Sequence, residues 1–347
     1  MDGRRLFRIL IVTLGISNAL FAQKEPAAPP KMSQKSPAAP SEIPRMTLKK
    51  VGSVEASLEG SGFYGSPLCD SEGNIYLRTD ASLRLDQNPV WKISPRGRKI
   101  EVFAPPVESS KEFRLGEFTV SGSGDFYAVT YDYNEETENY VLLHYGSDGE
   151  ISSKTHLQLP EQFHVDKLAV FASGSILVSG HFSSKAMESL RDQPRLLFLQ
   201  SDGTPGVQLQ LTGKAAAKVE GNLSQNSISM GDDGNAYLLR GPEVLVISPS
   251  GRLERTIPLS IPASGFDAER VEISKGVLSV TFSRIKPGTK GTVEVMFRTY
   301  DPVTGVVQAE YVPDSGLVYS LCFDPNEGYT FLGQNDGKTE LVRAWVR

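Results

Sequence analysis

The stretch DSEGNIYL at residues 70–77 recurs in altered form along the chain and decides the fold. In each copy a Gly closes a polar turn, and a run follows in which apolar and polar residues alternate. Gly at this place supplies the positive φ of a tight hairpin turn, and the alternation puts one face of a strand into a core. The other copies are SGSGDFYA (121–128), FASGSILV (171–178), GDDGNAYL (231–238), EISKGVLSV (272–280) and DPNEGYTFL (324–332).

A second motif, a short apolar strand that ends in another Gly-containing turn, follows five of these copies. It reads VWKISPRG (90–97), LLHYGSDG (142–149), LLFLQSDG (196–203), VLVISPSG (244–251) and MFRTYDPVTG (296–305). The Gly residues of the first motif lie 51, 50, 60, 42 and 52 residues apart. Units of about fifty residues with roughly four strands each are typical of β-propellers. The sequence therefore predicts an all-β, six-bladed β-propeller of four-stranded blades over residues 47–347.

The two ends of the repeat region predict how the ring closes. The sixth unit ends with ELVRAWVR at 340–347 and lacks a fourth strand, while the strand-like run VGSVEASLE at 51–59 precedes the first unit. We expect this N-terminal strand to complete the last blade, because closure removes an exposed sheet edge. An open array or a different number of blades is the alternative.

The repeats resemble a known group of propellers. The pattern D-x-x-G-N-x-Y-L at 70–77, nearly repeated at 231–238, and I-S-P-x-G at 93–97 and 247–251 are similar to NHL-repeat and TolB-like six-bladed propellers. The resemblance covers residues 51–347. It implies an architecture but no single function, because this superfamily contains scaffolds, sugar and peptide binders, lactonases and lyases.

The N-terminus has the features of an export signal. Arg4, Arg5 and Arg8 precede an apolar run at residues 9–21, and Ala22 offers a small residue for cleavage. We predict a signal peptide over 1–22, because the run is shorter than the ~20 residues of a membrane-spanning helix; an uncleaved anchor is the alternative. Residues 23–46 are rich in Pro and Ala and predict an extended linker. The mature chain is therefore expected in the periplasm or outside the cell, with no membrane span.

Charge and cysteine content exclude some classes of protein. The formal net charge is -5 and no basic stripe is present, so we expect no nucleic-acid partner. Two cysteines do not make a disulfide scaffold. Cys69 and Cys322 fall on the first strands of blades one and six, where a disulfide could join the ends of the ring. Aligning Asp70 with Asp324 puts the cysteines one register apart, on opposite faces, which favours two buried free thiols.

The resemblance also implies where a ligand would bind, over the central channel, at residues that precede first strands and follow second strands. The positions after second strands are Arg78, Asp80, Tyr131, Asp132, His181, Arg240 and Arg284. The positions on the first strands are Tyr64, Glu117, Asp166, Asn226 and Glu269. A ring of mixed sign with several arginines suits a ligand that carries a carboxylate or a sugar. The alternative is an ordinary solvated rim.

The sequence favours a binding or scaffold module over an enzyme. It contains no G-x-S-x-G nucleophile motif, and no constellation of catalytic residues emerges. Resemblance to gluconolactonases would make Glu117, Asp166 and Asn226 ligands of one divalent cation such as calcium, although the local sequence of that family is missing. We therefore expect no cofactor, and an unknown protein or a small ligand as partner. A metal-dependent hydrolase with its site at the central channel is the alternative.

Overall fold

The structure is a computed structural model that describes residues 43–56, 63–79, 89–105, 113–121, 123–132, 140–182, 196–207, 209, 227–289, 291–317, 319–335 and 338–346. These residues belong to one compact unit, Ile43–Arg347. The predicted signal peptide and most of the predicted linker lie outside the described residues. Within the described ranges, no helix has the length and apolar character needed to cross a membrane.

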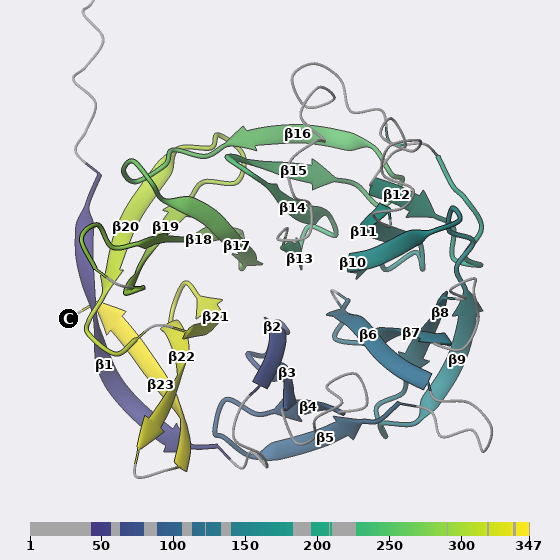
Figure 1. The fold of residues 1–347 in the computed structure, drawn as a ribbon, viewed down its shortest axis with the longest axis horizontal. Coiled ribbons are helices and arrows are strands. Elements are labelled where there is room, and N and C mark those ends of the chain that lie inside the picture. Colours follow the sequence, from purple (N-terminus) through teal and green to yellow (C-terminus); the bar gives the residue numbers. More distant parts are fainter. Residues whose placement is uncertain are drawn as a thin grey trace, which may run out of the picture. The chain divides into compact units, whose positions relative to one another are not determined.

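The described residues form 23 strands in five sheets, arranged around a centre like the blades of a propeller (Figure 1). Sheets 1 to 4 follow the chain, and strands β2, β6, β10 and β13 are the innermost of each. Sheet 1 contains β2 (Phe63–Cys69), β3 (Ile75–Thr79), β4 (Val90–Ile93) and β5 (Lys99–Phe103). Sheet 2 contains β6 (Phe113–Val120), β7 (Phe126–Asp132), β8 (Tyr140–Tyr145) and β9 (Ile151–His156).

Sheet 3 has three strands within the described residues, and sheet 4 has four. The chain after β12 is described only to residue 207 and at residue 209, with a bridge between Leu199 and Pro205. Sheet 3 contains β10 (Phe163–Val170), β11 (Ile176–Phe182) and β12 (Leu196–Leu199). Sheet 4 contains β13 (Ile228–Met230), β14 (Ala236–Arg240), β15 (Glu243–Ile247) and β16 (Leu253–Pro258).

Sheet 5 has eight strands in the order β17-β18-β19-β20-β1-β23-β22-β21. Its first half contains β17 (Asp267–Ser274), β18 (Val277–Ile285), β19 (Val293–Tyr300) and β20 (Val307–Pro313). Its second half contains β21 (Tyr319–Asp324), β22 (Gly328–Asn335), β23 (Lys338–Val346) and β1 (Arg45–Glu55). The sequence predicted six separate four-stranded blades. The structure has five sheets instead, because β1 joins the two halves of sheet 5.

Strand β1 makes this junction by pairing on both of its edges. Residues from Leu48 to Glu55 run antiparallel to β23, as the prediction of a completing N-terminal strand requires. Residues from Arg45 to Leu48 run parallel to β20, which belongs to the other half of sheet 5. The strand thus begins at Arg45, inside the segment 23–46 that was expected to be a linker.

The turn between first and second strands has the geometry that the repeat predicts. Gly73 and Gly234 have φ angles of 76° and 77°, a region that L side chains rarely adopt. The Gly73 N–H donates to the Asp70 carbonyl oxygen over 3.0 Å, and the Gly234 N–H donates to the Gly231 carbonyl oxygen over 2.9 Å. These hydrogen bonds close the hairpins that begin sheets 1 and 4.

The Asp, Asn and Tyr residues of the repeated pattern form a structural cluster at this turn. The Tyr76 hydroxyl donates to Asp70 over 3.1 Å, and the Tyr237 hydroxyl donates to Asp233 over 2.9 Å. The Asn235 amide donates to the same Asp233 carboxylate over 2.7 Å. Burial, together with the Asp233 carboxylate, raises the pKa of Tyr237 to about 12. The most recognisable part of the sequence thus serves folding rather than ligand binding.

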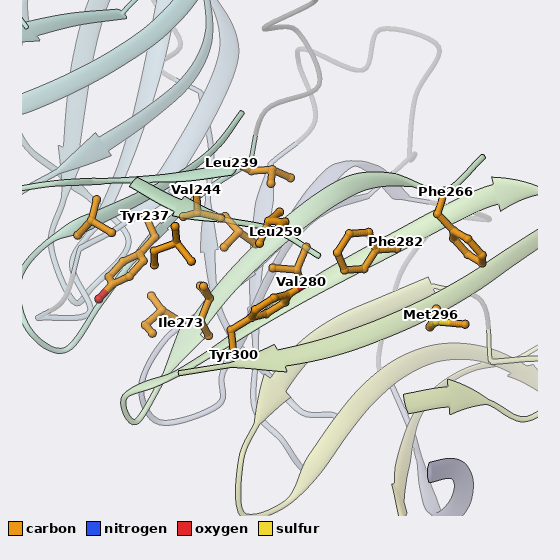
Figure 2. Close-up of a cluster of buried hydrophobic side chains, with 14 residues drawn as sticks. Tyr237, Leu239, Val244, Leu259, Phe266, Ile273, Val280, Phe282, Met296 and Tyr300 are labelled. Atoms are coloured by element: carbon orange, nitrogen blue, oxygen red, sulfur yellow. The ribbon is translucent and has the colours of Figure 1, made fainter. Parts of the chain in front are cut away.

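The core consists of apolar layers between neighbouring sheets. Figure 2 shows the layer between sheet 4 and the first half of sheet 5, where Tyr237 and Leu239 of β14 pack with Val280 and Phe282 of β18. All four side chains are buried. Because side chains alternate along a strand, each sheet sends one set of residues to the preceding layer and the other set to the following layer.

The expectation that Cys69 and Cys322 are free thiols is wrong, since they form a disulfide with Cα atoms 5.9 Å apart. Cys69 lies opposite Ile75 in the ladder, and both pack in the layer between sheet 1 and the second half of sheet 5 with Leu321 and Cys322. Tyr76, on the other face of sheet 1, packs against sheet 2. In a ring, one face of each sheet packs against the opposite face of the next sheet. Two cysteines that point to opposite faces of their own sheets therefore point toward each other, so the one-register offset allows the disulfide. We call this junction the seam.

Candidate functional site

The inner strands are interrupted by β-bulges at related positions. A bulge adds a residue that the partner strand does not pair, and it re-aims the side chains around it. The ladder register shifts between Tyr64 and Leu68, Leu115 and Phe118, Val165 and Lys167, Ala268 and Arg270, and Ser320 and Cys322. Glu117, Asp166 and Glu269, all predicted as site residues on first strands, lie at these bulges. The prediction thus selected positions where the inner strands depart from regular pairing.

The inner strands enclose a small central cavity of about 100 Å³. Its lining includes Glu117, Lys167, Arg270 and Glu272, from inner strands of sheets 2, 3 and 5. Sites for small organic ligands usually enclose roughly 300–1,000 Å³, whereas a cavity of this size suits ordered water. The channel mouth, as the term is used below, is the end of the channel at which the second strands β3, β7, β11, β14 and β18 finish.

Asp166 and His181 form the best-defined polar pair at the channel mouth. The His181 Nδ1 atom lies 2.9 Å from each Asp166 carboxylate oxygen. His181 is opposite His164 in the β10–β11 ladder, and the two rings stack with centroids 5.2 Å apart. The His181 side chain is 44% exposed and that of Asp166 is 14% exposed, so the carboxylate orients a ring that solvent can reach.

A second pair joins two neighbouring sheets. The Lys167 ammonium of β10 lies 2.7 Å from the Glu117 carboxylate of β6. Lys167 is adjacent in sequence to Asp166, at the bulge of β10. Of the predicted site residues, the structure brings Asp166 and His181 together, and Glu117 pairs with Lys167, which sequence reasoning missed.

The described residues do not fit the divalent cation that a gluconolactonase-like site would hold. Glu117 is bound by Lys167 and Asp166 by His181, so each carboxylate already has a cationic or donor partner. Asn226 lies outside the described residues. Among the residues that the structure describes, no three His, Cys, Asp or Glu side chains form a group able to hold a metal ion.

The predicted arginines are held by partners within or next to their own sheets. Arg240 lies 2.6 Å from Glu243, and Arg284 lies 2.7 Å from Glu294 while it covers the Phe266 ring. Arg78 donates to the Gly116 carbonyl oxygen at the bulge of β6 and lies over the Phe118 ring. The Glu269 carboxylate accepts a hydrogen bond from the Ser283 hydroxyl.

The remaining predicted residues are only partly described. Tyr64 lies opposite Arg78 in the β2–β3 ladder, and Tyr131 lies opposite Arg114 in the β6–β7 ladder. Asp132 ends strand β7. The side chains of these three residues, and the whole of Asp80 and Asn226, lie outside the described part of the chain.

Sequence reasoning also missed a buried charge pair at the centre of the ring. The Arg270 guanidinium donates to the carbonyl oxygens of Ser320, Pro67 and Leu321 over 2.7, 2.9 and 2.6 Å. It also lies 3.1 Å from Glu272, whose pKa is raised by burial against the opposing effect of Arg270. A signal was available, since Arg270 and Glu272 alternate with Val271 and Ile273 and therefore share one face of an inner strand.

Comparisons with known proteins assign no family to the chain. The sequence matches no protein-family model, and no curated protein matches it. The structure is similar to a protein of unknown function from Bacteroides caccae, at 14% identity and a TM-score of 0.44, over 73% of this chain and 88% of that one.

Two further solved structures are similar to this one. The WD40 domain of Pan2 from Neurospora crassa is 12% identical, with a TM-score of 0.45, over 86% of this chain and 97% of that one. A chain of a mitotic checkpoint complex is 10% identical, with a TM-score of 0.43, over 90% and 99% of the two chains. At these scores the likenesses assign no function, and the propeller-like fold rests on the strand pairing given above.

Proposed function

We propose that this chain is an exported, six-bladed β-propeller that acts as a non-catalytic binding module, with its ligand at the channel mouth. The observation that carries the proposal is the Asp166–His181 pair at the bulge of β10, with an imidazole that is 44% exposed. The pair offers a hydrogen-bonding group at the channel mouth that solvent can reach.

Among the described residues, no side-chain hydroxyl is hydrogen-bonded to the His181 imidazole. Covalent catalysis through a Ser or Thr nucleophile would need such a contact. Ser179 shares the β11 strand face with His181, but its hydroxyl is buried and has no hydrogen-bond partner. The pair is therefore better suited to hold a ligand than to activate a nucleophile.

Six blades of the NHL-repeat and TolB-like kind are part of the proposal. Counting the two halves of sheet 5 separately gives six units, each with an inner strand and a repeat turn. The parallel pairing of β1 with β20 is then a link between the outer edges of two blades. The G-N-x-Y-L part of the pattern, which residues 70–77 and 231–238 share, supports this assignment, since its Tyr bonds to a turn Asp in both copies.

Export is supported by the N-terminal sequence and by the disulfide. Arg4, Arg5 and the apolar run at 9–21 have the order of a secretory signal. The Cys69–Cys322 disulfide adds to this, because disulfides form and persist in oxidising compartments outside the cytosol. We therefore place the mature chain in the periplasm or outside the cell.

The proposal is tested with the exported chain, purified and screened by thermal shift against sugars, carboxylic acids and short peptides. A compound that raises the melting temperature is then titrated by calorimetry. His181→Ala should weaken its binding about tenfold or more, since it removes a hydrogen-bonding ring from the mouth. His156→Ala is the matched control, because His156 is an exposed histidine on the outer strand β9.

Two results would contradict the proposal. Equal loss of binding in the two histidine variants would place the ligand away from the channel mouth. Hydrolysis of a lactone that stops when a chelator is added, with a matching loss of one divalent cation by native mass spectrometry, would establish the metal-dependent hydrolase instead.

A further inference from the structure

One guanidinium holds the backbone on both sides of the seam disulfide. Arg270 of β17 donates to the Pro67 carbonyl oxygen on β2 over 2.9 Å, and to the Ser320 and Leu321 carbonyl oxygens on β21 over 2.7 and 2.6 Å. Each of these carbonyls lies within two residues of a cysteine of the disulfide. Strand β17 carries neither cysteine, so Arg270 is a third element that bridges the two strands of the bond.

The three carbonyl oxygens lie where the inner ladders are interrupted. The register shifts between Tyr64 and Leu68 on β2, and between Ser320 and Cys322 on β21. A bulge leaves backbone groups without a ladder partner, and a buried carbonyl oxygen without a donor costs free energy. The Arg270 guanidinium supplies these donors from five N–H groups in one plane. The spacing of the two seam strands is therefore fixed by hydrogen bonds in addition to the disulfide.

Glu272 extends this hold on β21. Its carboxylate lies 3.1 Å from the Arg270 guanidinium and accepts a hydrogen bond from the Phe323 N–H over 3.2 Å. Strand β21 is thus bonded to β17 on both sides of Cys322, through Leu321 and Phe323. These contacts do not involve sulfur, so they hold Cys322 in place whether or not it is oxidised.

The two sulfur atoms differ in their access to solvent. Cys69 is half-buried, whereas Cys322 is only 7% exposed. The Cys69 Sγ atom lies 3.2 Å from the Leu321 carbonyl oxygen, to which a reduced thiol can donate. Thiol–disulfide exchange requires access to one of the sulfur atoms. A small thiol or disulfide therefore meets Cys69 before Cys322.

We propose that the Cys69–Cys322 disulfide is a redox-sensitive lock on the ring, and that Arg270 positions its two thiols for closure. Oxidised glutathione, a small disulfide, serves as the oxidant. The Cys69 thiolate attacks one glutathione sulfur and releases the other as a thiolate, and the Cys322 thiolate then attacks the Cys69 sulfur and releases the second glutathione. Two electrons pass to glutathione, whose two released thiolates take up the two protons that the cysteines lose. Arg270 contacts neither sulfur and is a positioning residue.

The lock is tested through the effective concentration of the two thiols. The exported chain is reduced and equilibrated in mixtures of reduced and oxidised glutathione, and the bonded fraction is measured by alkylation and mass spectrometry. Arg270→Met should lower the effective concentration at least tenfold in native buffer, because the two strands lose their common donor. It should change nothing in concentrated urea, where these contacts are absent.

Leu239→Ala is the matched control for a general loss of stability. Leu239 is buried in the layer between sheet 4 and the first half of sheet 5, so its truncation leaves a cavity away from the seam. We expect its effective concentration to change less than twofold. Arg270→Lys keeps a cation beside Glu272 but loses the planar set of donors, and it should fall about threefold. This variant provides the test if reduced Arg270→Met is unfolded by circular dichroism.

The order of attack is tested with single cysteine variants. Cys322→Ala should form a mixed disulfide at Cys69 when oxidised glutathione is added, whereas Cys69→Ala should react at least fivefold more slowly at Cys322. Equal rates would refute Cys69 as the point of entry.

Three further outcomes overturn the inference. Equal falls in Arg270→Met and Leu239→Ala would show that general stability, and not positioning, controls closure. An unchanged effective concentration in the two Arg270 variants would show that strand pairing alone brings the thiols together. A disulfide that excess dithiothreitol fails to reduce in the folded chain would refute a redox-sensitive lock.

Discussion

The seam and the layer between sheets 3 and 4 join neighbouring sheets in different ways. The seam carries the Cys69–Cys322 disulfide and the Arg270 hydrogen bonds, which reach the bulges of β21 and β2. The layer between sheets 3 and 4 consists of apolar side chains, and it contains two buried polar atoms without hydrogen-bond partners, Ser179 Oγ and Arg240 Nη1.

Chain connectivity explains this difference. Sheets 3 and 4 follow one another in the sequence, so a short stretch of chain keeps them together. The two sides of the seam are 253 residues apart at the disulfide, and closing a longer loop costs more conformational entropy. Strong cross-links thus occur where the chain itself provides no tether. Unpaired buried polar atoms do not distinguish the two regions, since Trp91 Nε1 in the seam also has no hydrogen-bond partner.

Removing the disulfide should have the largest effect. The Cys69→Ala, Cys322→Ala double variant should lose roughly 4 kcal/mol of unfolding free energy, because the bond restricts a long loop in the unfolded chain. Urea unfolding followed by tryptophan fluorescence measures this loss. Added reductant should destabilise the natural chain and leave the double variant unchanged; equal stability of the two proteins would show that β1 alone closes the ring.

Replacing the central arginine of the seam should cost somewhat less. Arg270→Met should lose about 3 kcal/mol, because Glu272 remains buried without its cation and three carbonyl oxygens lose a donor. Arg240→Met is the matched change in the other layer, and it should lose about 1 kcal/mol or less, since Glu243 is 25% exposed and one guanidinium nitrogen has no partner. Equal losses in urea unfolding would abolish the contrast between the two regions.

The seam should also respond to pH through Glu272. Burial raises the pKa of this carboxyl above its ordinary value in the folded chain, so the folded state holds the proton more tightly than the unfolded state. Its contribution to stability is full below the unfolded pKa and is lost as pH rises through the raised folded pKa. Glu272→Gln should flatten this decline in unfolding free energy above about pH 4.3, where an unfolded Glu titrates. An unchanged pH profile would assign the decline to other groups.

The repeated turns could be predicted from the sequence because their information is local. Gly73 and Gly234 must adopt positive φ, and Tyr76 and Tyr237 reach an Asp a few residues away. The fusion of two predicted blades into sheet 5 could not be predicted in this way. It depends on a parallel pairing of Arg45 to Leu48 with residues from Glu310 to Pro313.

The partners of the candidate site residues are also non-local. Glu117 and Asp166 could be placed on first strands, but one unpaired residue at a bulge decides which way each side chain points. The Lys167 ammonium that binds Glu117 is 50 residues away, and the Ser320 carbonyl oxygen that binds Arg270 is equally distant. Cys69 and Cys322 illustrate the same limit. Their positions on opposite strand faces were predicted correctly, but the prediction did not consider that opposite faces of neighbouring sheets pack against each other.

The smallest predicted effect has the opposite sign and lies in the layer between sheets 3 and 4. Ser179→Ala should raise the unfolding free energy by about 1 kcal/mol, because it removes a buried hydroxyl that has no partner. Ser279→Ala is the matched control, since the Ser279 hydroxyl is also buried but lies 2.9 Å from the Tyr329 hydroxyl, and its loss should cost about 1 kcal/mol. Urea unfolding of both variants tests the contrast. If both lose stability, the Ser179 hydroxyl has a bound water or another partner, and the predicted gain is refuted.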